Sequence, residues 1–471
     1  MQTAARTIDQ LPGPRGLPVV GNLLQLRGSR MHTILQGWAE EFGPIFAFRF
    51  FRRPVVVIAD VELIHRVLRD RPEGFRRRTA IRDAMRELGI DGLFVAEGAD
   101  WRRQRKLTMH ALNTDHLRDF FGRLEQVTGR LQRRWERAAD EGSRVDAQRD
   151  LMRFTVDVTS GLVFGYDLNT LEQRADAIQQ HLGKMFPALL RRLLAPVRYW
   201  HYVKLPVDRE LDAAVAEVHK LAAALIARAR ARLEREPGLR ARPGNLLEAI
   251  IAAQDAETGA FSDREVLGNA LTMLLAGEDT TANTISWVIH FLVRHPDVHA
   301  RAREEVDRVL GGADRPADYT STEALRFVEA VAHEAMRHKP VAPFLAFEPY
   351  EDVELGGVKV PAGNVVYLLT GKVANEEKNF ADARAFRPER WLEGGGQTHP
   401  GHDTRAFLPF GAGARFCPGR HLAMLEIKMV IAMLCRNFEV GPVADAAAVE
   451  EVFSLTMRPE NLFVSLRRRS R

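Results

Sequence analysis

The segment from Ser262 to His295 limits the possible folds of this chain more than any other stretch. It opens with a Ser-x-x-Glu capping box, Ser262 to Glu265, which marks the start of a helix. Apolar residues then cover nearly every side of the predicted helix, which is typical of a buried one. At 1.5 Å per residue the helix is roughly 50 Å long. It therefore crosses a whole large domain.

The middle of this predicted helix contains the polar stretch AGEDTTANT, residues 276–284. Gly277 costs a helix about 1 kcal/mol relative to alanine, and polar side chains here compete with the backbone for hydrogen bonds. We predict that the Thr280 hydroxyl bonds the carbonyl of Ala276 and leaves room beside Gly277 for a small molecule. A polar patch on an exposed helix face is the simpler interpretation. The flanking apolar runs favour burial, where Asp279 and Thr280 form an acid–alcohol pair suited to proton delivery.

Helical patterns dominate the rest of the chain. Apolar residues at three- and four-residue spacing predict long helices over about 115–141 and 208–236. Alternating β-branched residues with Gly or Pro turns predict strand hairpins at 43–60 and 352–369. No linker or internal repeat divides the chain. We therefore predict a mainly α fold with a minor β-sheet region, formed as one large domain over residues 1–471.

The amino-acid composition argues against a disulfide-stapled, a membrane-spanning and a nucleic-acid-binding protein. Two cysteines in 471 residues are too few for a disulfide scaffold, so we expect a reducing, cytoplasmic location. No run of 18 apolar residues occurs and the N-terminus is polar, so we expect neither a membrane span nor a signal peptide. The net charge of +5 comes from scattered arginines rather than one basic face. We expect no nucleic-acid partner, and we expect a monomer.

One of the two cysteines, Cys417, lies in the glycine-rich stretch FGAGARFCPGR, residues 410–420. The three glycines permit backbone shapes closed to other residues and a close approach to a partner. Pro418 suits the first turn of the apolar helix that follows, to about Phe438. Free N–H groups at that helix N-terminus favour a thiolate.

Several uses of such a cysteine are open. Zinc requires three or four ligands, and only His421 follows nearby. A nucleophilic cysteine needs a base, which the sequence does not exclude. An inert buried thiol fits Cys435, deep in the apolar helix, but leaves the glycines around Cys417 unexplained. A single thiolate ligand is typical of haem iron, because porphyrin fills the four equatorial positions.

The loop resembles the haem-binding pattern Phe-x-x-Gly-x-Arg-x-Cys-x-Gly of the cytochrome P-450 family, in its soluble bacterial type. This resemblance implies one cytochrome P-450-type domain. Haem b would lie between the long central helix and the helix after the cysteine, with Cys417 as the iron ligand. The haem-contacting residues implied here and by the WRRQR and AGEDTT motifs are Phe410, Gly411, Arg415, Cys417, Gly419, Trp101, Arg105, Ala276 and Gly277.

Two further motifs are similar to those of the same family. AGEDTT resembles its oxygen-binding groove and implies catalytic roles for Asp279 and Thr280. Glu334 and Arg337 form a Glu-x-x-Arg pair, which alone is a common helix surface pattern. Arg390 in FRPERW resembles the third member of the family's structural Glu–Arg–Arg triad.

The chain also departs from the family pattern. A strand position that often holds a propionate-binding arginine or histidine is Phe347 here. The run Arg76–Arg78 offers candidate replacements, although a solvated face is the simpler interpretation for most of it. Residues 1–22 form an extended N-terminal segment with the proline-rich hinge LPGPRGLPVVGN, and we expect no membrane anchor before it.

The resemblance implies a monooxygenase that inserts one atom of O2 into a lipophilic small molecule by hydroxylation or epoxidation. We expect no reductase domain, so NAD(P)H supplies electrons through a separate ferredoxin or flavodoxin and its reductase. A basic patch of Arg102, Arg103, Lys106 and Arg420 is either a docking site for that partner or an ordinary solvated face. A peroxide-driven peroxygenase and a non-enzymatic haem-based gas sensor are the alternatives.

The substrate site is placed by resemblance alone. Residues 79–94 resemble the variable loop over the haem, and residues 183–200 resemble the mobile roof, which is apolar enough to contact a membrane surface. The sequence does not indicate the substrate or the position oxidised. The predicted lining residues are Leu275, Ala276, Val341, Ala342, Phe344 and Leu455.

Overall fold

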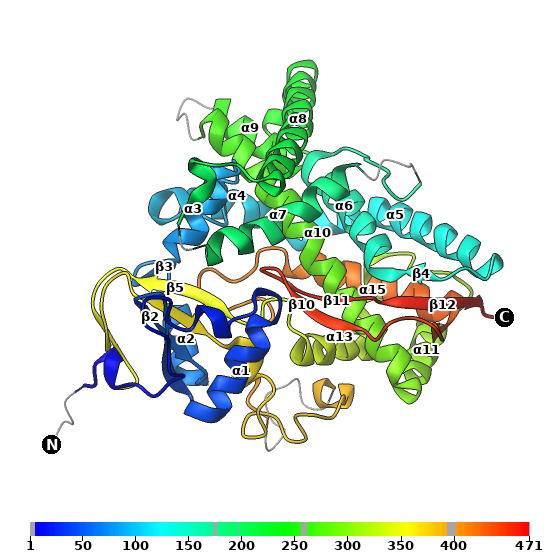
Figure 1. Cartoon of the computed structure of the whole chain (residues 1–471). Helices are drawn as coiled ribbons and strands as arrows, with labels where there is room; N and C mark the ends of the chain where they lie inside the picture. The colour runs from blue at the N-terminus through cyan, green and yellow to red at the C-terminus, as the bar shows by residue number, and fades with distance from the viewer. Residues whose placement is uncertain (1–4, 173–176, 196, 256–260, 393–401, 471) are drawn as a thin grey trace.

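The long central helix is α10, Asp263–Arg294, and the other helices pack around it in the computed structural model (Figure 1). The structure describes residues 5–172, 177–195, 197–255, 261–392 and 402–470. Ser262 caps α10 by accepting a hydrogen bond from the Glu265 N–H, and the Glu265 carboxylate returns one to the Ser262 N–H at 2.8 Å. The predicted capping box and helix are therefore confirmed.

The helices α6, α8, α13 and α15 all contact α10. Those expected over 115–141 and 208–236 are α5 and α8. The described helices other than α10 are α1 Met31–Phe42, α2 Val61–Arg69, α3 Thr79–Glu87, α4 Gly98–Ala111, α5 Thr114–Asp140, α6 Ala147–Phe164, α7 Ala177–Leu194, α8 Pro206–Arg235, α9 Leu246–Asp255, α11 Pro296–Leu310, α12 Tyr319–Glu323, α13 Arg326–His338, α14 Thr370–Val373 and α15 Arg420–Asn437.

The largest sheet has the strand order β1-β2-β8-β5-β3 and lies beside α1 and α2, on the N-terminal side of the molecule (Figure 1). Its strands are β1 Ile45–Phe50, β2 Arg53–Ile58, β3 Phe75–Arg77, β5 Leu345–Pro349 and β8 Val365–Leu368. The predicted first hairpin is confirmed as β1 and β2, with Ile45 opposite Ile58.

The second predicted hairpin is correct only in part. Over 352–369, β6 (Val353–Leu355) and β7 (Val358–Val360) pair with each other. The third strand of the segment, β8, leaves them and pairs in parallel with β2. The smaller sheets near the C-terminus are formed by β4 Val145–Asp146, β9 Phe438–Pro442, β10 Glu450–Phe453, β11 Met457–Glu460 and β12 Phe463–Arg468.

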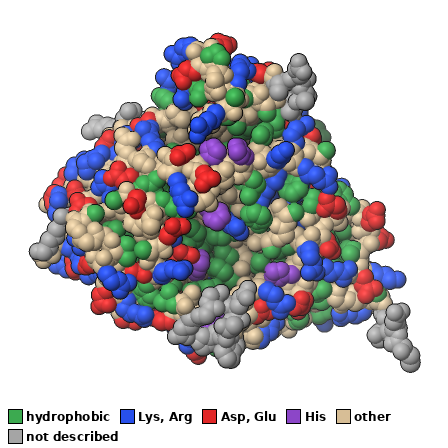
Figure 2. Space-filling model, turned by 180° about the vertical axis from the view of Figure 1, so that it is seen from behind, with side chains coloured by type: hydrophobic (Ala, Val, Ile, Leu, Met, Phe, Trp, Pro, Cys, Tyr) green, Lys and Arg blue, Asp and Glu red, His purple; other side chains and the backbone are tan. Residues whose placement is uncertain are grey.

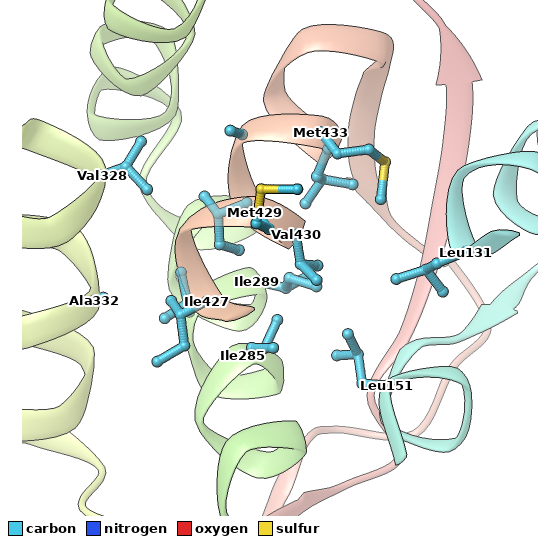
Figure 3. Close-up of a cluster of buried hydrophobic side chains, with 14 of the residues drawn as sticks. Leu131, Leu151, Ile285, Ile289, Val328, Ala332, Ile427, Met429, Val430 and Met433 are labelled. Carbon is cyan, nitrogen blue, oxygen red and sulfur yellow. The ribbon is translucent and has the colours of Figure 1, made fainter. Parts of the chain in front are cut away.

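A buried apolar cluster joins α15 to the helices around it (Figure 3). Ile285 and Ile289 of α10 lie close to Val430 of α15, and Leu131 and Leu151 close the cluster from α5 and α6. Each of these side chains is at most 1% exposed. Burying one such side chain contributes about 1.5–3 kcal/mol. This cluster therefore fixes α15 relative to the central helix, and α15 in turn positions the loop that precedes it.

None of the described helices combines the length and apolar character that crossing a bilayer requires. The N-terminal segment is irregular from Leu11 onward, with left-handed backbone at Val19 and Gly21. Residues 1–4 of the extended segment expected over 1–22 lie outside the described residues. The mainly α fold with a minor β-sheet region is confirmed.

Candidate functional site

The loop before α15 holds Cys417 in a defined turn. Gly411 and Gly413 both have φ of 69°, in the left-handed region that glycine tolerates best. The Cys417 N–H donates to the Phe410 carbonyl at 2.8 Å, which closes the loop, and Gly419 is the N-cap residue of α15. Cys417 therefore lies just before a helix N-terminus, as predicted.

The reason for Gly413 differs from the expected one. A Cβ added there would lie 2.2 Å from the carbonyl oxygen of Leu68, at the end of α2. No atom lies within 4 Å of a Cβ added at Gly411. The close approach at Gly413 is therefore to the chain's own backbone, and it locks the loop against α2.

Two opposing effects act on the Cys417 thiol. Burial raises its pKa above the ordinary value, while the Gly419 N–H and the positive charges of Arg105 and Arg420 lower it. The balance leaves the pKa raised, so the helix terminus alone does not produce a thiolate. Coordination of a metal ion would favour the thiolate, because only the deprotonated sulfur is a ligand.

The predicted haem-contacting residues Trp101, Arg105 and Arg415 come together beside this loop. The Arg415 guanidinium carbon lies 4.5 Å from the Trp101 ring centroid, and that of Arg105 lies 4.5 Å from the Phe416 ring centroid. Arg415 also donates to the Ala96 carbonyl at 2.9 Å. Arg415 Nε and Arg105 Nη2 are buried without a hydrogen-bond partner among the described residues. Such donors fit an anionic group such as a haem propionate, because an unsatisfied buried donor is costly.

Sequence reasoning missed one arginine of this region, Arg71. It is 4% exposed, and its guanidinium carbon lies 4.1 Å from the ring centroid of Phe347, the position where the family resemblance predicts a cation. Burial and the charge of Arg415 lower the pKa of Arg71 to about 10. Arg71 belongs to no motif, and only the packing of α2 against the strands brings it here.

The three arginines of the run Arg76–Arg78, candidates for binding a propionate, have different partners in the structure. Arg76 pairs with Glu348 at 3.2 Å, and Arg78 donates to the Tyr367 hydroxyl at 3.1 Å. Arg77 stacks on Phe94, 3.5 Å from the ring centroid, and donates to the Phe94 carbonyl at 3.0 Å. The Arg77 guanidinium lies within electrostatic range of Arg71 and Arg415.

In α10, the Thr280 hydroxyl donates to the Ala276 carbonyl at 2.9 Å, as predicted. On the side that faces α6 there is no free room at Gly277, because a Cβ there would lie 2.3 Å from the Thr159 hydroxyl. Gly277 thus allows α6 to pack against α10. The exposed residue of this turn is Ala276.

Asp279 is buried, 7% exposed, and burial raises its pKa. Its carboxylate accepts a hydrogen bond from the Thr456 hydroxyl, on the turn between β10 and β11. The preceding residue, Glu278, is also buried, and burial raises its pKa well above the ordinary range. The sequence contains no signal for the Thr456 contact, because the two residues lie far apart in the chain.

Glu334, Arg337 and Arg390 form the predicted triad. The Glu334 carboxylate accepts from Arg337 Nη2 at 2.8 Å and from Arg390 Nε at 3.0 Å, and all three side chains are 0% exposed. The Trp391 indole adds a bond at 2.8 Å. Although burial opposes ionisation, hydrogen bonds from His338 and Arg337 hold the pKa of Glu334 well below its usual range.

The predicted substrate-lining residues divide into two groups. Leu275 and Leu455 share an apolar cluster with side chains of α3 and α7, the elements expected above the haem. The Val341 carbonyl accepts a hydrogen bond at 2.8 Å from the N–H of Met457, which belongs to the sheet-side core. Phe344 instead packs between the rings of Tyr367 and Phe453 in the sheet-side core.

Much of the expected basic patch is neutralised. Arg102 pairs with Glu73, and Arg103 with Glu265, each at 2.5 Å. Arg420 is exposed and stacks on Phe416. Figure 2 shows one face of the molecule, on which basic, acidic and histidine side chains border a recessed apolar area.

A sequence model of the cytochrome P450 family matches residues 11–466. The chain belongs to the cytochrome P450 family. It is therefore a haem- and O2-dependent oxidoreductase of the monooxygenase class.

Among known relatives, the human mitochondrial 25-hydroxyvitamin D-1 alpha hydroxylase is 29% identical over 97% of this chain and 92% of its own length. The mouse enzyme is 27% identical over 98% of this chain and 92% of its own length. A self-sufficient cytochrome P450 monooxygenase of Phanerodontia chrysosporium is 27% identical over 96% of this chain. The chain spans only 42% of the length of that fungal protein.

Proposed function

We propose that this protein is a haem-thiolate monooxygenase that takes Cys417 as its single iron ligand and oxidises a lipophilic small molecule. The observation that supports this most is the loop of Cys417. It places a thiol before a helix N-terminus, beside buried guanidinium groups of Arg105 and Arg415 that lack full hydrogen bonding. Among the described residues, no group of three His, Cys, Asp or Glu side chains is arranged to hold a metal, which disfavours zinc.

When bound, the haem supplies oxygen activation, and a thiolate ligand favours O–O cleavage. The chain's own residues manage protons and solvent. Because burial raises its pKa, Asp279 retains a proton at higher pH than an ordinary carboxyl and can pass it toward the Thr280 hydroxyl. The Ala276 carbonyl orients that hydroxyl. Phe410 shields the sulfur, and the Glu334 triad keeps the region before the loop rigid.

The proposed substrate is lipophilic because Leu275 and Leu455, two of the predicted lining residues, lie among apolar side chains of α3 and α7. These two helices contact each other. An apolar enclosure excludes water and favours an apolar ligand. The related mammalian enzymes are named as hydroxylases, which is consistent with hydroxylation as the reaction.

We propose a separate redox partner, a ferredoxin or flavodoxin with its NAD(P)H-dependent reductase. The fungal relative is named self-sufficient, and the match covers 42% of its length; the mammalian relatives are named hydroxylases, and the match covers 92% of theirs. Since Arg102 and Arg103 already pair with acidic residues, Lys106 and Arg420 are the better candidates for contact with an acidic partner. A cytoplasmic monomer of bacterial type remains our expectation.

Oxygen labelling tests the proposed reaction. The holoenzyme is incubated with NADPH or NADH, a ferredoxin and its reductase, 18O2, and lipophilic compounds first selected by spectral shift. The proposal predicts products that contain one labelled oxygen atom. Efficient oxygen transfer from hydrogen peroxide alone would favour the peroxygenase instead. Haem binding without product under either condition would favour a gas sensor.

A further inference from the structure

Arg71 is a buried cation whose hydrogen bonds are incomplete. It follows α2 and is 4% exposed, and its Nε and Nη2 atoms have no partner among the described residues. Its guanidinium lies over the Phe347 ring, 4.1 Å from guanidinium carbon to ring centroid. A cation–π contact of this kind does not satisfy N–H donors or replace the hydration that burial removes. The side chain therefore requires an anion that the chain itself does not provide.

The region around Arg71 also contains too little negative charge to balance its arginines. Arg77 and Arg415 lie within electrostatic range of Arg71, and the carboxylate that acts on both Arg71 and Arg77 is Glu97, whose side chain is 15% exposed. Glu97 is already engaged, since it accepts from the Arg77 backbone N–H at 3.0 Å and from the Arg415 side chain. Three guanidinium groups thus share one carboxylate, which leaves a formal surplus of two positive charges.

The other charged or titratable groups nearby do not remove this surplus. Glu73 is exposed and pairs with Arg102 at 2.5 Å. Burial raises the pKa of the Tyr350 phenol, which is therefore neutral near pH 7. The charge of Arg105 interacts with Cys417, the proposed iron ligand, as well as with Arg415. Haem carries two propionates, so its charge matches the surplus.

We propose that Arg71 binds a haem propionate and replaces the cation missing from the strand at Phe347. Phe347 lies directly opposite Arg77 in the β3–β5 pair. The Phe347 ring supports the guanidinium plane, while the unpartnered Nε and Nη2 donate to the carboxylate in the paired geometry that arginine favours. This inference rests on the proposed haem function and deepens it.

The experiment compares three variants as purified holoenzymes. Arg71→Gln removes the charge, Arg71→Lys keeps the charge without the planar fork, and Arg102→Gln removes an exposed arginine paired with Glu73 as the control. Two properties are measured. One is the rate of haem transfer to excess apomyoglobin, and the other is the propionate-bending bands in the resonance Raman spectrum.

We expect Arg71→Gln to accelerate haem transfer about tenfold or more, the cost of one lost charge-assisted hydrogen bond. It should also shift a propionate-bending band. Arg71→Lys should shift the same band with a smaller rate change, and Arg102→Gln should change neither.

Unchanged bands and rate in Arg71→Gln would overturn the inference. If that variant does not fold, an unshifted band in Arg71→Lys would overturn it equally. The wild-type carbonyl spectrum separates the two proposals. If the wild type shows a thiolate spectrum and the Arg71 variants change neither the Raman bands nor the haem-transfer rate, only this inference is contradicted. If the wild type shows no thiolate spectrum, the haem-thiolate function is contradicted.

Discussion

Thr456, on the turn between β10 and β11, donates its hydroxyl hydrogen bond to the carboxylate of Asp279 in the middle of the central helix. Both side chains are buried. The neighbouring Leu455 has a left-handed φ of 76°, an uncommon conformation that the surrounding structure must maintain. The turn between β10 and β11 thus contributes Leu455 to the apolar cluster and, through Thr456, holds Asp279, the proposed proton donor. Substrate binding beside Leu455 and proton delivery from Asp279 therefore depend on the same turn.

Thr456→Val should disturb proton delivery while leaving haem binding intact. Valine is close to isosteric but cannot donate a hydrogen bond, so the Asp279 carboxyl loses its orientation. We expect the fraction of NAD(P)H converted into product to fall several-fold. Thr128→Val, which removes a buried hydroxyl bonded to Leu124 at 2.8 Å in α5, is the matched control. Equal coupling in both variants would contradict the role of Thr456.

Thr280→Ala should divert electrons into hydrogen peroxide. The hydroxyl that donates to the Ala276 carbonyl would be absent, so the proposed proton path from Asp279 would lose its acceptor at Thr280. Haem content and substrate-induced spectral shifts should remain those of the wild type. Peroxide and product are quantified for each NAD(P)H consumed. An unchanged product yield would refute the function assigned to Thr280.

Gly411→Ala and Gly413→Ala should differ sharply, although both residues have φ of 69°. At Gly411 a methyl group enters open space, so the cost is the left-handed backbone alone, about 1–2 kcal/mol. At Gly413 the methyl would lie 2.2 Å from the Leu68 carbonyl oxygen, so α2 and the loop must separate. We expect haem content near that of the wild type for Gly411→Ala and strongly reduced for Gly413→Ala. Equal haem content in the two would argue against the contact between loop and α2.

Glu334→Gln should destabilise the protein by about 3–5 kcal/mol at neutral pH, because two buried arginines lose their shared charge. The pKa of Glu334 is lower folded than unfolded, so its stabilisation is present above the unfolded value near 4.3 and is lost as pH falls below it. Thermal unfolding followed from pH 7 down to about pH 3 should show a constant difference from the wild type above about pH 5 and a shrinking one below about pH 4. Glu389→Gln, in the exposed pair with Arg301, is the control. A pH-independent difference would contradict a charge-based role.

Local signals were sufficient for part of the fold and site. The capping box at Ser262, the glycines before Cys417 and the Glu-x-x-Arg pair each depend on near neighbours in the chain, so their patterns predicted the observed structure. The contacts of Arg71 with Phe347 and of Thr456 with Asp279 depend on tertiary packing, and no local pattern encodes them. Two other residues without a motif, His338 and Lys339, also form long-range contacts, with Ala385 and Glu451 respectively. Gly277 and Gly413 were predicted as special positions, but the partners that require them are Thr159 and Leu68, which only the fold identifies.

The carbonyl spectrum of the reduced protein tests the central claim, that Cys417 is the thiolate ligand of haem iron, most directly. The wild-type protein is reduced with dithionite under carbon monoxide and compared with Cys417→Ala and with Cys435→Ala, the second cysteine, which is fully buried in α15. We predict the long-wavelength absorption that thiolate ligation produces in the wild type and in Cys435→Ala, and its loss in Cys417→Ala. A histidine-type spectrum in the wild type, or an unchanged spectrum in Cys417→Ala, would contradict the claim.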